Sequence, residues 1–137
     1  EDYRLSALSE QCERLPDARL CRLVLPEVLG TRALESLRAW VRSHAERFCG
    51  VVTANPSQLE LDWGLPVHAD APLHAFNPWA AEFLFDAGCE SVTASPELTL
   101  GQLQAMTSLG GSFAVQIYGR ERLMLGVHTS PGRPING

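Results

Sequence analysis

The chain has 137 residues, of which 45% are hydrophobic, and its formal net charge is −5. This length fits one domain with a hydrophobic core, and no apolar run reaches the ~18 residues of a membrane span. The acidic balance without a large basic block argues against non-specific binding of duplex nucleic acid, and the absence of Lys excludes lysine-based Schiff-base and P-loop chemistry within the chain.

The first part of the chain predicts an irregular segment, a strand and a long helix. Residues 1–19 are polar and irregular, with a short helix over 6–14 that Pro16 ends. Residues 20–25 form the first predicted strand, and Pro26 stops it. A helix over 31–48 follows, with Thr31 as its N-cap, because apolar side chains recur there at steps of three and four residues.

The second part predicts four more strands, each followed by polar, Gly or Pro residues. Asn55 with Pro56 caps a short helix, with Gln58 reaching back as in a capping box, and Asn77 with Pro78 caps another. Thr99 and Gln102 form a further capping box. After the last predicted strand the alternation of strands and helices ends, and a tail rich in Gly and Pro follows. The predicted strands cover 49–54, 66–70, 91–94 and 113–118, the last two helices cover 79–87 and about 99–110, and the tail is 126–137.

This alternation predicts an α/β fold of parallel strands joined by crossover helices. Two architectures fit: a partial (β/α)8 TIM-type barrel and an open doubly wound sheet. Closing a barrel takes about 250 residues, so this chain supplies an arc of one at most. The expected organisation is an N-terminal segment over 1–19, a βα-repeat domain over 20–125 and a tail over 126–137.

Chemistry in such sheets collects beyond the carboxyl ends of the strands. Asp70 stands there as a candidate base, with capping of the next loop as its structural alternative. Glu97 offers a second carboxylate, although a first helical turn also favours an acidic side chain. The guanidinium of Arg120 could bind a carboxylate or phosphate through two parallel hydrogen bonds. The other candidates at these ends are predicted to bind substrate: Asn55, His68, His74, Asn77, Ser95 and Tyr118.

Other kinds of site receive little support from the sequence. The four cysteines have no C-x-x-C spacing and are predicted to be reduced structural thiols. His68, Asp70 and His74 match no common metal signature, so no metal site is predicted. Ser95 lacks the G-x-S-x-G elbow of a serine hydrolase.

Three motifs in the second half carry a family resemblance. They are Ala69-Asp70 followed by Asn77, the run Ser95-Pro96-Glu97-Leu98, and Tyr118-Gly119-Arg120 with Met124. With these motifs, residues 48–128 resemble peptidase family U-32, the collagenase-like peptidases of unknown catalytic type.

The resemblance implies a barrel of which this chain is the later part. It also implies a peptidase or other hydrolase. The expected catalytic residues are the strand-end carboxylates Asp70 and Glu97, and the resemblance adds support to Glu97. Some family members look like oxygen-independent hydroxylases of RNA bases or a quinone precursor, which use an iron–sulfur cluster. Thr129 or Ser130 stands where the first cluster cysteine is expected, and His74 replaces a usual asparagine. No cofactor is therefore expected within this chain, and a cluster only in a longer parent.

The leading hypothesis is thus a fragment of a U-32-like bacterial-type putative protease with its pocket at the strand ends. The alternatives are an iron–sulfur hydroxylase completed outside this chain and a non-catalytic binding or structural barrel domain. The substrate is expected to be a peptide, a small molecule or RNA. With no secretory signal found, a cytoplasmic location is expected. Self-association is expected as well, since five strands leave the edges of an unclosed barrel exposed.

Overall fold

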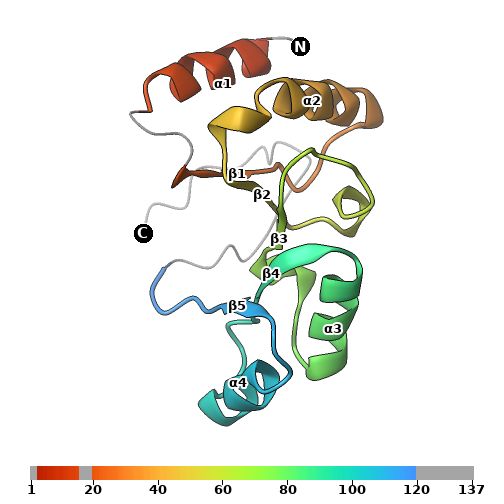
Figure 1. The fold of residues 1–137 in the computed structure, drawn as a ribbon, viewed down its shortest axis with the longest axis vertical. Helices are drawn as coiled ribbons and strands as arrows, with labels where there is room; N and C mark the ends of the chain where they lie inside the picture. Colours follow the sequence, from red (N-terminus) through yellow and green to blue (C-terminus); the bar gives the residue numbers. More distant parts are fainter. Residues whose placement is uncertain (1–2, 16–19, 120–137) are drawn as a thin grey trace, which may run out of the picture.

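Five short parallel strands form the centre of the molecule. The structure is a computed structural model that describes residues 3–15 and 20–119. The strands are paired in the order in which they occur in the chain, from β1 to β5. Figure 1 shows them running in this sequence through the middle of the molecule, with α1 and α2 above them and α4 below. The strands are β1 (Arg22–Val24), β2 (Gly50–Thr53), β3 (Val67–Ala69), β4 (Cys89–Thr93) and β5 (Ser112–Ala114).

A helical segment lies between each pair of successive strands, as the alternation predicts. The α-helices are α1 (Tyr3–Glu13), α2 (Thr31–Ser43), α3 (Pro78–Asp86) and α4 (Leu100–Thr107). The described residues also form the short 3-10 turns η2 (Ala45–Arg47), η3 (Pro56–Gln58) and η4 (Ala71–Leu73). Between β2 and β3 the chain crosses through a 3-10 turn and a loop, and β3 begins at Val67, nine residues after Gln58. None of the described helices is long and apolar enough to cross a membrane.

The strand order contains no reversal. Each strand pairs in parallel with the next one in the chain. Because crossover connections between parallel strands are right-handed, a sequential order places every crossover on the same face of the sheet. A doubly wound sheet needs a point at which the order reverses. For the described residues the doubly wound alternative is therefore wrong, and the sheet is singly wound.

One face of the sheet is covered by helices and holds the core. Val51 of β2 packs with Leu37 and Val41 of α2 in one buried cluster. In the second cluster, Ala69 and Val92 pack with side chains of α3 and α4, among them Leu84 and Met106. Val67 touches both clusters, so the two join across β3.

The other face of the sheet carries no described helix and combines small and polar side chains with Arg22 and two valines. Side chains alternate between the two faces of a strand, so the neighbours of the core residues point to this side. The interior of a closed barrel is normally filled by bulky branched side chains. We call this surface the helix-free face; it comprises Arg22, Val24, Gly50, Val52, His68, Ser91, Thr93, Ser112 and Ala114.

Helix α1 packs on α2 and belongs to the same body as the sheet. The indole nitrogen of Trp40 donates a hydrogen bond of 2.9 Å to Ser9 Oγ. Arg47 donates to the carbonyl of Cys12 at 3.1 Å, and the Cys12 side chain is buried. The helix predicted over 6–14 is thus present and begins earlier, at Tyr3.

Most predicted helix starts are confirmed, and two details are wrong. Asn55 and Asn77 cap their helices, and Thr99 with Gln102 forms the predicted capping box. Thr31 is not an N-cap, because Gly30 occupies that position and no side chain caps the helix. Gln58 does not reach back to Asn55 either. Its side chain is buried, where it accepts a hydrogen bond from Thr53 Oγ1 at 2.6 Å and donates one to the Pro26 carbonyl at 2.8 Å.

The last strand is shorter than predicted. The apolar run over 113–118 predicts a strand, but β5 ends at Ala114. Val115, Ile117 and Tyr118 are exposed. No described strand lies beyond β5, so the alternating run has nothing to pair with or pack against on that side.

Candidate functional site

The carboxyl ends of β3 and β4 are brought together by a second contact after the strands. Ala75 and Ala94 form an isolated parallel bridge, and the Ser95 amide donates to the Ala75 carbonyl at 3.2 Å. The loop after β3 therefore returns to lie beside the start of the loop after β4. These two loops carry Asp70, His74, Asn77, Ser95 and Glu97, so the structure gathers these predicted residues along one edge of the sheet.

Asp70 is fixed directly after β3. Its amide donates to the Thr53 carbonyl of β2 at 2.8 Å, and its Oδ1 accepts from the Ala71 amide at 2.8 Å. The carboxylate is half-buried and caps η4. The structural alternative for Asp70 is thus realised, while Oδ2 has no hydrogen bond among the described residues.

The two asparagines of the edge hold the backbone. Asn55 Oδ1 accepts from the amide and hydroxyl of Ser57, and Asn55 Nδ2 donates to the Glu27 carbonyl at 2.7 Å. Asn55 thereby ties the loop after β1 to the loop after β2. Asn77 Oδ1 accepts from the Ala80 amide at 2.9 Å. Both side chains have clear structural roles.

Ser95 and Glu97 differ in exposure although they are neighbours in the loop. Ser95 is 3% exposed, and its Oγ accepts a long hydrogen bond of 3.4 Å from the Glu97 amide. The Glu97 side chain is exposed. Within the described ranges no hydrogen bond or ion pair joins Glu97 to Asp70, so the two carboxylates share an edge without direct contact.

His74 adopts a backbone conformation that is rare for residues other than glycine. Its φ is +55°, in the left-handed region, and it ends η4. Its exposed ring stacks on Phe76 with centroids 5.6 Å apart. Strained backbone of this kind is held by its surroundings and concentrates near functional loops.

His68 lies within the sheet, away from this edge, on the helix-free face. The side chain is 3% exposed, and its Nδ1 shares a hydrogen bond of 2.8 Å with Ser91 Oγ. The Nε2 atom is buried and has no hydrogen-bond partner among the described residues. Burial lowers the pKa of His68, and the positive charge of Arg22 lowers it further, while Glu90 acts in the opposite direction.

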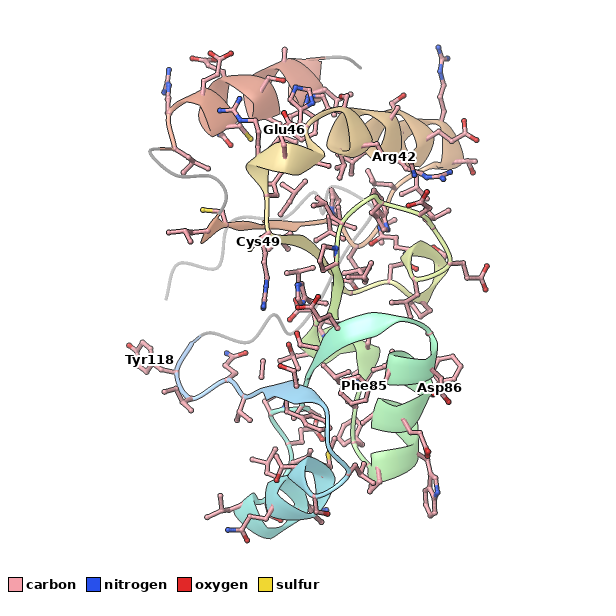
Figure 2. The ribbon with its side chains drawn as sticks, viewed as in Figure 1. Arg42, Glu46, Cys49, Phe85, Asp86 and Tyr118 are labelled. Atoms are coloured by element: carbon pink, nitrogen blue, oxygen red, sulfur yellow. The ribbon has the colours of Figure 1, made fainter. Side chains whose placement is uncertain are left out.

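Tyr118 and Arg120 do not extend this edge in the described structure. Tyr118 is 97% exposed, and Figure 2 shows it on the loop after β5, pointing away from the rest of the molecule. Arg120 lies outside the described residues, as do Met124, Thr129, Ser130 and the predicted tail over 126–137.

The residues that can ligate metals are dispersed. Among residues 3–15 and 20–119, no group of three or more His, Cys, Asp or Glu side chains is placed to hold a metal ion. Cys12 and Cys89 are buried, and burial raises the pKa of both thiols. Cys49 is exposed, in contrast to the structural role predicted for the cysteines. These described thiols do not form a cradle for an iron–sulfur cluster.

Sequence reasoning missed the surroundings of His68. The positive charge of Arg22 on β1 lowers the pKa of His68. A β-bulge between β3 and β4 leaves Glu90 as an extra residue between Cys89, which pairs with Val67, and Ser91, which pairs with His68. The alternation of β1, with Leu23 in the core, would have assigned Arg22 to the face opposite the helices. The bulge has no local signal in the sequence, because it depends on the pairing of two distant strands.

No protein-family model matches the chain, and neither the curated proteins nor the solved structures gave a match.

Proposed function

We propose that this chain is part of a (β/α)-barrel hydrolase resembling peptidase family U-32, with a peptide-binding pocket along the carboxyl ends of β3 and β4. The observation that carries the proposal is the singly wound parallel sheet, whose carboxyl edge gathers Asp70 and Glu97. In barrel enzymes this edge holds the active site. The sheet would continue into a closed barrel with strands from outside the described residues.

In this pocket Asp70 is the general base. Its Oδ1 is held by the Ala71 amide, which fixes the carboxylate and leaves Oδ2 to take a proton from a water molecule or a substrate group. Glu97, exposed in the next loop, is the second acid–base group. His74 and Asn77 lie in the same loop as Asp70 and would contact the bound peptide.

The test is hydrolysis of a gelatin-derived peptide by the protein and by Asp70→Asn. Asparagine keeps an oxygen that can cap η4 but removes the carboxylate, so the variant separates chemistry from capping. We expect kcat to fall at least about 100-fold, as for the loss of a general base. The control is Asp86→Asn, an exposed carboxylate at the end of α3. Equal activity of the wild-type protein and Asp70→Asn would overturn the role of Asp70.

A non-catalytic binding domain is the second candidate, and one observation favours it. Asp70, Asn55 and Asn77 are all engaged in capping backbone amides, which a fold that had lost its chemistry would still require. Under this alternative the wild-type protein cleaves no peptide, and Asp70→Asn binds peptide as well as the wild type does.

The hydroxylase alternative and the cytoplasmic location remain predictions. The first requires an iron–sulfur cluster held by cysteines outside this chain. Iron and sulfide analysis of the longer protein, purified without oxygen, tests it. Fractionation of the source cells tests the second.

A further inference from the structure

The most unusual polar group in the described structure is the Nε2 atom of His68. It is buried and has no hydrogen-bond partner among the described residues, although a buried polar nitrogen without a partner costs free energy. The other ring nitrogen is held by Ser91, which fixes the orientation of the imidazole. Such a group in the middle of a sheet indicates that something outside the described residues satisfies it.

The position of Nε2 is defined by Gly50. A Cβ atom built on Gly50 would lie 2.5 Å from Nε2, so the ring rests directly over the glycine backbone. Gly50 is in register with Arg22 of β1. The imidazole therefore leans from β3 across β2 toward the strand that carries Arg22.

Arg22 stands on the same helix-free face. Its neighbour Leu23 packs in the core under α2, so Arg22 points to the opposite side. It is exposed and forms no ion pair within the described ranges. Its positive charge lowers the pKa of His68. A guanidinium is a donor, and Nε2 is also a donor when Nδ1 accepts from the Ser91 hydroxyl. Two such donors on one face match the oxygens of an anion.

The rest of this face carries small hydroxyl side chains beside His68. Along the row through His68, the in-register residues on β4 and β5 are Ser91 and Ser112. Both side chains are small and carry a hydroxyl group, where the interior of a barrel normally has bulky apolar residues. Among the described residues, Glu90 is the acidic side chain whose charge acts on His68. It would oppose an anion, so binding depends on Arg22.

We propose that Arg22 and the Nε2 atom of His68 form an anion-binding site on the helix-free face, which takes a carboxylate or phosphate group. Ser91 is a positioning residue, because it acts through Nδ1 of His68. The site lies on a different part of the sheet from Asp70 and Glu97. The proposal of an anion site therefore does not depend on the proposed hydrolase activity.

The experiment is a titration of the 137-residue protein, followed through the NMR signals of the His68 ring. Inorganic phosphate and acetate are added separately at constant ionic strength, with chloride as the control anion. We expect one of them to shift the His68 signals saturably while chloride does not. The more effective anion identifies the group as phosphate or carboxylate. A mutant that lacks His68 assigns the signals.

The decisive comparison uses two arginine variants. Arg22→Gln should weaken the binding at least about tenfold. Arg32→Gln, an exposed arginine of α2 whose side chain makes no described contact, should bind like the wild type. His68 signals that respond to neither anion, or that respond equally in Arg22→Gln and the wild type, would overturn the proposal. Circular dichroism of both variants verifies that the fold is intact.

Discussion

At the scale of single residues, the lowered pKa of His68 predicts that the stability of the protein depends on pH. Its pKa is lowered below the ordinary value of 6.5, first by burial and then by Arg22. Protonation therefore favours the unfolded chain, in which the ring is solvated. The contribution is complete above about pH 6.5 and is lost as the pH falls below that value toward the pKa of the folded state.

The expected result is a free energy of unfolding that decreases as the pH falls below 6.5. Urea unfolding at several pH values measures it. Arg22→Gln should make the decrease smaller, because it removes one cause of the lowered pKa. A free energy of unfolding that does not change between pH 7 and pH 5 would contradict the neutral, buried state of His68.

Gly50 illustrates how one backbone position supports this ring. In Gly50→Ala the new methyl group would meet Nε2 at 2.5 Å and the Pro66 carbonyl at 3.0 Å. We expect a loss of about 1–3 kcal/mol in the free energy of unfolding, because the ring must move away. Gly101→Ala is the control: nothing lies within 4 Å there, and alanine in α4 should stabilise by up to about 1 kcal/mol. Thermal unfolding of both variants shows whether each substitution raises or lowers the stability.

At the scale of elements, the crossing from β2 to β3 depends on Gln58 rather than on a long helix. Its side chain joins Thr53 of β2 to the Pro26 carbonyl after β1, and its own carbonyl accepts from the Trp63 indole at 2.9 Å. The buried amide therefore ties the start of this crossing to β2 and to the loop after β1. Trp63, which is almost fully buried, closes this region against α2.

Gln58→Ala should destabilise the protein by about 2–3 kcal/mol, because the buried Thr53 hydroxyl and the Pro26 carbonyl both lose their hydrogen bonds to this side chain and the buried side-chain volume is lost. Gln104→Ala, on the exposed side of α4, is the matched control and should change the free energy of unfolding by less than about 0.5 kcal/mol. Urea unfolding of both variants measures the difference. Equal stability of the two variants would show that Gln58 is not needed to hold the crossing.

The parts of the fold that the sequence predicts are those with local causes. Asn77 and Thr99 cap helices through side chains and amides only a few residues apart, so their roles are visible in the sequence. Gln58 has the same local pattern, but distant partners determine its role. β5 ends at Ala114, opposite the last residue of β4, so its length depends on a distant strand.

In the candidate site, too, the features with local causes are predictable from the sequence and those that depend on distant strands are not. The positions of Asp70 and Glu97 at strand ends follow from the alternation of strands and helices. The burial of His68, and its approach to Arg22, depend on strand register and a bulge, which no local pattern reveals. The singly wound order is also a property of the whole sheet, so periodicity alone left the architecture open.

At the scale of the whole molecule, both edges of the sheet are open among the described residues. β1 and β5 each pair on one side only. Val24 on β1 and the run after β5 with Ile117 and Tyr118 expose large apolar side chains next to these edges. Unpaired parallel edges with apolar side chains favour pairing with further strands.

We therefore expect the 137-residue protein to self-associate. Sedimentation velocity should show species larger than the monomer that increase with protein concentration. A lysine in place of Val24 should reduce the association, since charged side chains protect sheet edges. A concentration-independent monomer that binds no dye for apolar surfaces would contradict the partial-barrel proposal and indicate a self-sufficient open sheet.

The central proposal is that the carboxylate of Asp70 acts chemically at the strand ends and does more than cap η4. The most direct measurement is the ratio of kcat/KM for peptide hydrolysis between Asp70→Asn and the wild-type protein, with urea unfolding of both. We predict a ratio below about 0.01 with unchanged stability. A ratio near one, or peptide hydrolysis absent from the wild-type protein, would contradict the proposal.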